Sequence, residues 1–136
     1  MQTNQEEYKG LNILCIDGGG VRGLSPLIIL QEMMHRVENA RGGDRVHPYE
    51  YFDVIAGTGT GGISACMLGR LRMPIEKAIE KYANLVKEVF KEKKMSGPTM
   101  YKATKLQEAL KTMIREATGD GMEMMSEDQN DNPCKT

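Results

Sequence analysis

Two glycine loops, each directly after a short apolar run, constrain the fold of this chain more than any other feature. The first loop covers residues 18–23 and follows the run 11–16; the second covers residues 57–62 and follows the run 51–56. A continuous apolar run of this length is typical of a strand buried on both faces of a parallel sheet. A helical pattern follows each loop. The sequence therefore predicts two strand–loop–helix units with adjacent parallel strands.

Helical periodicity describes most of the remaining sequence. The spacing of apolar residues predicts helices over 24–37 and 63–68, and a long amphipathic helix that begins at Pro74. A last helix is expected to begin at Thr104, with Gln107 at capping-box spacing, and to end near Gly119. The apolar positions expected to face a core are Leu24, Leu27, Ile28, Met34, Val37, Ile75, Ile79, Tyr82, Val86, Phe90, Leu106, Leu110, Met113 and Ala117.

The order of these elements predicts an α/β fold. Residues 1–10 are polar and are expected to be a disordered lead-in, with a single domain portion over 11–136. Two strands alone do not make a stable parallel sheet, because such sheets need several strands and cover on both faces. We therefore expect the sheet to be incomplete in this chain.

Composition and charge exclude several classes of function. The net charge of −1 gives no general attraction to nucleic acid, so no nucleic-acid partner is expected. No stretch approaches 18 apolar residues, so no transmembrane segment is expected. The polar, acidic N-terminus does not resemble a signal peptide, and we expect a cytoplasmic chain.

The three cysteines give no sign of a metal site. Cys15, Cys66 and Cys134 are widely spaced and form no CxxC pair, so neither zinc nor a disulfide framework is expected. Cys15 and Cys66 lie in apolar runs and are expected to be small buried hydrophobes. We expect no metal and no cofactor.

Both glycine loops match G-x-G-x-x-G, so dinucleotide binding is one interpretation. Asp17 weakens it for the first loop, because a carboxylate at the strand end would repel a pyrophosphate. The second loop lacks an acidic residue at the end of a following strand. The other interpretation is that the loops present backbone N–H groups to an anion, including the oxyanion of acyl transfer.

The second loop has the frame of a nucleophile elbow, Gly-x-Nuc-x-Gly, in which a sharp turn between strand and helix exposes one side chain. Its five residues are Gly57, Thr58, Gly59, Thr60 and Gly61. Gly59 occupies the nucleophile position, so the frame is present without a nucleophilic side chain at its apex.

Two longer motifs give a specific resemblance. DGGGVRG at residues 17–23 resembles the oxyanion-hole motif of the patatin-like phospholipases, and FDVIAGT at 52–58 with TGG at 60–62 resembles the elbow segment of that family. The resemblance covers about residues 10–136. It implies a three-layer α/β/α fold with a mostly parallel central sheet, a Ser–Asp dyad, and hydrolysis of acyl esters of phospholipids or related lipids at a membrane surface. The oxyanion-hole residues that it implies are Gly18, Gly19, Gly20, Arg22 and Gly23.

The sequence departs from the family pattern in two places. The elbow serine of the family is replaced by Gly59, and the family's catalytic aspartate belongs to a later Asp-Gly segment. Asp120-Gly121 resembles that segment, but its position after a helix end predicts a capping turn. Residues 132–136 resemble the lead into the family's next strand. We therefore expect 11–136 to be the N-terminal portion of such a domain, truncated on the C-terminal side.

Other polar residues near the loops are weaker candidates for chemistry. Ser25, Thr58, Thr60 and Ser64 lie off the elbow apex and are expected to be helix caps or turn residues. The two histidines, His35 and His47, are expected to be solvated.

Three functional hypotheses therefore stay open. The chain is a lipid acyl hydrolase domain with impaired chemistry, a non-catalytic lipid- or partner-binding regulatory module, or a truncated product without independent function. A longer parent chain with further domains is compatible with each of them.

Overall fold

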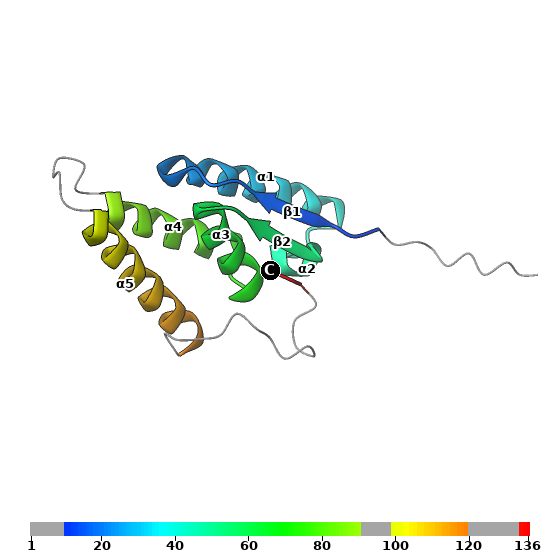
Figure 1. Ribbon diagram of the computed structural model, residues 1–136. Coiled ribbons are helices and arrows are strands. Elements are labelled where there is room, and N and C mark those ends of the chain that lie inside the picture. Colours follow the sequence, from blue (N-terminus) through cyan, green and yellow to red (C-terminus); the bar gives the residue numbers. More distant parts are fainter. Residues whose placement is uncertain (1–9, 91–98, 120–133) are drawn as a thin grey trace, which may run out of the picture.

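A computed structural model describes residues 10–90, 99–119 and 134–136 (Figure 1). The elements in chain order are β1 (Ile13–Ile16), the 3-10 helix η1 (Gly20–Gly23), α1 (Leu24–Ala40), α2 (Pro48–Tyr51), β2 (Val54–Gly57), α3 (Thr60–Ala65), the π-helix η2 (Cys66–Arg70), α4 (Ile75–Phe90) and α5 (Thr99–Thr118). The expected disordered lead-in, apart from Gly10, and the Asp120-Gly121 turn lie outside the described residues. The fold is a mostly helical α/β arrangement, as the sequence predicts.

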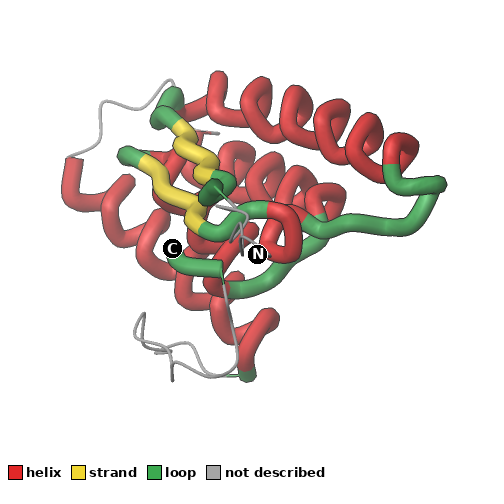
Figure 2. Tube along the Cα trace, turned by 90° about the vertical axis from the view of Figure 1, so that its right-hand side faces the viewer, coloured by secondary structure: helices red, strands yellow, loops and turns green. Residues whose placement is uncertain are grey.

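β1 and β2 pair in parallel, which confirms the central prediction from the sequence (Figures 1 and 2). Ile13 lies opposite Val54, and Ile16 lies opposite Gly57. On its other edge β2 meets the end of the chain through a parallel bridge between Val54 and Lys135. The Ile55 N–H donates to the Lys135 carbonyl oxygen at 2.8 Å, and the Lys135 N–H donates to Asp53 O at 2.8 Å. The strand order therefore runs β1, β2, Lys135 in one direction.

One face of this small sheet is covered and the other is open. Ile16 is 5% exposed and Ile55 is fully buried, whereas Ile13 is 57% exposed and both Cys15 and its partner Ala56 are exposed. Right-handed crossovers place successive connections on the same face when the strand order keeps one direction. The helices therefore gather on a single side of the strands, and the expectation that Cys15 is buried is wrong.

The core lies between the covered face of the sheet and the helices. Leu27, Leu30 and Met34 of α1 are buried in it, as are Ile75 and Tyr82 of α4. α4 lies between α1 and α5 and packs against both (Figure 1). The expected core-facing position Ile28 is instead 51% exposed, because the face of α1 that packs on the core is centred on Leu30 and Met34.

Some boundaries differ from the expected ones. Tyr51 ends the short helix α2 and is not the first residue of a strand, because Pro48 occupies the first helical turn, where proline is favoured. Thr104 lies inside α5, which begins at Thr99, so it does not cap that helix. Gly119 is a C-cap as expected: it has φ +83°, and its N–H donates to Arg115 O at 2.8 Å. No helix in the described parts of the chain is both long and apolar enough to cross a bilayer.

Candidate functional site

The two glycine loops meet at the carboxyl ends of β1 and β2, because parallel strands end at the same edge of the sheet (Figure 2). The Thr58 N–H donates to Ile16 O at 3.1 Å. A Cβ on Gly18 would lie 2.7 Å from Thr58 O, which is closer than real Cβ atoms approach backbone oxygens. Glycine at position 18 therefore allows the two loops to touch.

The second loop makes a sharp turn between β2 and α3, at the place where the sequence predicts a nucleophile elbow. Gly59 has φ +57° and ψ −128° and directly precedes α3, so the chain turns sharply from strand to helix at this residue. A Cβ on Gly57 would lie 2.1 Å from Gly61 O, and a Cβ on Gly61 would lie 2.2 Å from Ile16 O. Both flanking glycines are thus required by space, which is how the sequence closes so tight a turn.

Gly59 itself is not required by space. A Cβ at this position would meet only the Gly18 Cα, at 3.8 Å, which is an ordinary van der Waals contact. Its positive φ is the one feature that disfavours other residues there. The turn therefore has room at position 59 for a small side chain.

Two threonines of the elbow bind the backbone of the first loop. The N–H groups of Gly19 and Gly20 both donate to Thr60 Oγ1, each at 3.1 Å, and the Gly18 N–H donates to Thr58 Oγ1 at 3.4 Å. Neither hydroxyl caps α3, whose N-terminus has no side-chain cap. The sequence predicts that these threonines are helix caps or turn residues; they lie at the turn and not at a cap, and they join the two loops across about forty residues of sequence.

These bonds leave a different set of N–H groups open. The Arg22 N–H donates to Gly19 O at 3.0 Å. Within the described part of the chain the N–H groups of Val21 and Gly59 have no hydrogen-bond acceptor. Thr60 is the first residue of α3, so its N–H has no acceptor inside that helix. The open donors therefore come from both loops, and Val21 is one that the sequence motif did not single out.

Tyr82 of α4 supports the first loop from the core side. Its side chain is 1% exposed, and its hydroxyl donates to Gly20 O at 2.5 Å. A Cβ on Gly23 would lie 2.0 Å from Tyr82 Oη, so only glycine at position 23 allows this approach. Helical periodicity predicts that Tyr82 is buried, but no sequence signal connects it with a loop 62 residues away.

The remaining polar candidates do not complete a catalytic set. Ser25 and His35 are exposed, and His47 stacks on Tyr49 at 5.4 Å between ring centroids. Ser64 is 1% exposed, and its Oγ has no acceptor or donor among the described residues. Burial raises the pKa of Cys66, which keeps this thiol protonated and a poor nucleophile.

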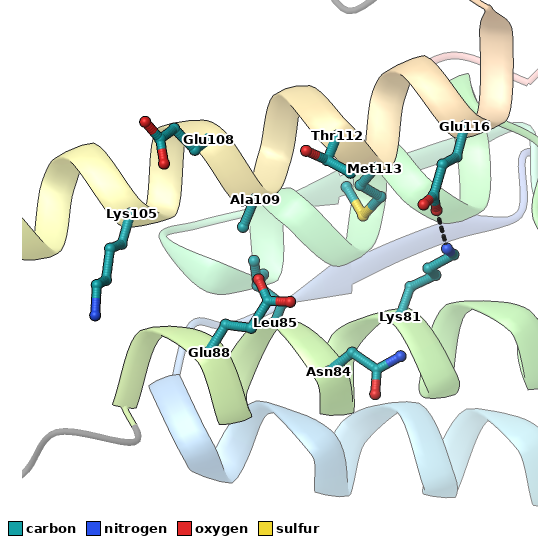
Figure 3. A pocket seen from close by; sticks show the side chains of 10 residues that line it. All are labelled: Lys81, Asn84, Leu85, Glu88, Lys105, Glu108, Ala109, Thr112, Met113 and Glu116. Atoms are coloured by element: carbon teal, nitrogen blue, oxygen red, sulfur yellow. Dashed lines mark hydrogen bonds and ion pairs between the residues drawn. The ribbon is translucent and has the colours of Figure 1, made fainter.

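A cavity of about 550 Å³ lies away from the loops, between α4 and α5 (Figure 3). Leu85 of α4 and Met113 of α5 both line it, and Lys81 and Glu116 form an ion pair at one end. Lys81 lowers the pKa of Glu116, first by its hydrogen bond and then by its charge. No residue of either glycine loop lines this cavity, so it is not part of the site formed by the loops.

Comparisons with known proteins match a range of the chain that contains both glycine loops. The family model for patatin-like phospholipase matches residues 14–123. The chain is 41% identical over 92 residues to phospholipase A I of Arabidopsis thaliana, a match that covers 68% of this chain and 6% of that protein. It is 37% identical over 89 residues to human calcium-independent phospholipase A2-gamma, covering 65% of this chain and 10% of that protein.

A third relative matches a shorter part of the chain. Patatin-like protein 2 of Arabidopsis thaliana is 47% identical over 58 residues, which is 43% of this chain and 14% of that protein. The chain therefore spans only a small part of the length of these relatives. No solved structure matches it significantly.

Proposed function

Because this chain belongs to the patatin-like phospholipase family, we propose that its two glycine loops form the acyl-ester site of a lipid acyl hydrolase domain in which chemistry is impaired at Gly59. Residues 11–136 would be the N-terminal portion of that domain. The parallel bridge from Val54 to Lys135 supports this proposal, because it places the chain end beside β2 as a further strand would lie. The open sheet face supports it too, since parallel sheets are covered on both faces.

One observation carries the proposal: Gly59 lies in a sharp turn between β2 and α3, at the position that an elbow nucleophile would occupy. Its φ of +57° and ψ of −128°, together with the steric need for Gly57 and Gly61, define a turn that presents position 59 outward. The open N–H groups of Val21 and Thr60 lie in the two loops that flank it. Such donors suit the negative oxygen that develops when an ester carbonyl is attacked.

The same geometry supports the proposed impairment of the chemistry. In a serine hydrolase the elbow hydroxyl attacks the ester carbonyl and a base takes its proton. Gly59 has no atom beyond Cα, so no acyl–enzyme bond can form at the apex. Neighbouring hydroxyls do not replace it, because Thr58 Oγ1 and Thr60 Oγ1 are directed at the N–H groups of the first loop.

A non-catalytic lipid- or partner-binding module is the second candidate. The specific observation in its favour is that the N–H groups of Val21 and Gly59 stay open while the nucleophile is missing. Such a site can bind the anionic or carbonyl oxygen of a ligand without hydrolysing that ligand. The partner we propose in both cases is an acyl ester at a lipid surface, and the location we propose is the cytoplasm.

Ester hydrolysis tests the proposal. The chain and its Gly59→Ala variant should both hydrolyse p-nitrophenyl butyrate and phosphatidylcholine at background rate, because loss of a nucleophile costs roughly 10⁶ in kcat. Gly59→Ala is the matched variant, since it adds a methyl group at the apex without adding an oxygen. Turnover of roughly 1 s⁻¹ or more that persists in Gly59→Ala would show that another residue performs the attack, and the proposal would fail.

Binding separates the two candidates. Co-sedimentation with phosphatidylcholine vesicles that does not lead to hydrolysis would favour the binding module. Absence of both co-sedimentation and hydrolysis would favour the impaired hydrolase domain.

A further inference from the structure

The peptide group between Gly20 and Val21 is held from one side by the core. Tyr82 Oη donates to Gly20 O at 2.5 Å, and the tyrosine ring is 1% exposed. Gly23, itself buried, lacks the Cβ that would stand 2.0 Å from that hydroxyl. The buried Tyr82 hydroxyl therefore holds the Gly20 carbonyl oxygen by a hydrogen bond, and Gly23 leaves the space that this hydroxyl needs.

The hydrogen bond to the Gly20 carbonyl also fixes the direction of the Val21 N–H, which belongs to the same peptide group. A trans peptide is planar, so its C=O and N–H point in opposite directions. The carbonyl of Gly20 points to Tyr82 in the core, and the N–H of Val21 must then point away from the core. The Val21 residue is 50% exposed, and its N–H has no acceptor among the residues that the structure describes.

Among the described residues, Val21 is a donor of the first loop that has no acceptor. The N–H groups of Gly18, Gly19 and Gly20 are engaged by threonine hydroxyls, and that of Arg22 by Gly19 O. The preceding N–H, on Gly20, is 3.1 Å from Thr60 Oγ1, so Val21 lies next to the N-terminus of α3. The orientation of one peptide group thus decides whether the first loop presents a donor beside the elbow.

We propose that Tyr82 is a positioning residue that aims the Val21 N–H at an anionic oxygen bound beside Gly59. The inference rests on the proposed function, because it names the part of the fold that orients one donor of that site. The ligand class is an oxyanion that carries an alkyl or acyl chain, such as a carboxylate, a phosphonate or the tetrahedral oxyanion of ester attack. Tyr82 does not touch this ligand; it acts through the peptide group between Gly20 and Val21.

The test uses Tyr82→Phe in the full chain with hexylphosphonate as the probe. The variant keeps the buried ring and removes only the hydroxyl, and Tyr51→Phe is the control, because it removes a tyrosine hydroxyl from α2. Titration is followed by the amide resonances of Val21 and Gly59 in a ¹⁵N-labelled chain. Tyr82→Phe should weaken binding about five- to tenfold, as loss of one orienting hydrogen bond does, while Tyr51→Phe should leave the Kd within about twofold.

A measurement without the probe keeps the two proposals separable. In the free protein the Gly20 carbonyl ¹³C and the Val21 amide ¹H resonances should both move in Tyr82→Phe and stay in place in Tyr51→Phe. Gly23→Ala should move them too, because its Cβ displaces the Tyr82 hydroxyl. If these resonances do not respond to Tyr82→Phe, or if the variant binds the probe with the wild-type Kd, the positioning role is wrong.

Failure of the proposed function would be seen in the titration of the wild-type chain. If hexylphosphonate shifts neither Val21 nor Gly59 in the wild-type chain, the anion site is refuted. The response of the free-protein resonances then still decides whether Tyr82 orients the peptide group.

Discussion

Replacing Gly59 by serine adds an oxygen at the apex of the proposed elbow, and its effect on stability can be worked out from the structure. Gly59 has φ +57° and ψ −128°, a region that is costly for any residue with a Cβ, by about 1–3 kcal/mol. No steric clash adds to this, because the new Cβ would meet only the Gly18 Cα at 3.8 Å. The lower unfolded-state entropy of serine offsets about 0.4–1 kcal/mol. The net destabilisation is therefore about 0.5–2 kcal/mol.

Thermal unfolding followed by circular dichroism measures this effect. For a chain of this size the expected fall in Tm is about 2–8 °C. Gly42→Ser is the matched control, because Gly42 also has a positive φ of +82° and open space around it, yet lies in the loop after α1. Both variants should lose stability, and only Gly59→Ser should change the binding of hexylphosphonate. A Gly59→Ser chain more stable than the wild type would show that position 59 is not a strained elbow, and the assignment of the site would fall with it.

Three further changes test other parts of the structure. Gly61→Ala should destabilise far more than Gly59→Ala in thermal unfolding, because its Cβ would stand 2.2 Å from a backbone oxygen; equal losses would contradict the tight turn. Cys15 should react with iodoacetamide faster than Cys66, because Cys15 is exposed and burial raises the pKa of Cys66. Mass spectrometry identifies the cysteine that is alkylated first. Alkylation of Cys66 before Cys15 would show that the face of the sheet that carries Cys15 is covered. Lys81 lowers the pKa of Glu116, so the ion pair should stabilise the fold above the usual glutamate pKa of about 4.3 and should lose this effect as the pH falls through the lowered pKa. Glu116→Gln should therefore make Tm depend less on pH in the acid range. An unchanged pH profile of Tm would show that the ion pair contributes nothing to stability.

Local sequence predicted the elements well wherever a local cause decides them. The apolar runs before each glycine loop form β1 and β2, and Pro74 directly precedes α4. Boundaries failed where two local signals compete. Tyr51 has high strand propensity, but Pro48 starts a helical turn that includes it. Thr104 with Gln107 has capping-box spacing, yet the helix runs through it from Thr99.

The candidate site was predictable only in part. The motif predicted a tight turn around Gly59, and the structure has one, because glycine at position 57 lets the backbone approach Gly61 four residues later. The motif did not reveal which N–H groups of the first loop stay open. The N–H groups of Gly19 and Gly20 donate to Thr60 Oγ1, about forty positions later in the sequence, and a hydrogen bond over this separation cannot be predicted from the local sequence.

The sequence by itself determined the strand–loop–helix units, their parallel direction and the missing oxygen at position 59, because backbone conformation, hydrophobic period and side-chain chemistry are local properties. The tertiary structure alone decided which face of the sheet is covered and where the donors of the first loop point. The helices cover one face of the sheet because the strand order runs in one direction, so that both right-handed crossover connections lie on the same face. Donor orientation follows from Tyr82, whose hydroxyl reaches Gly20 O only after α4 packs against the core.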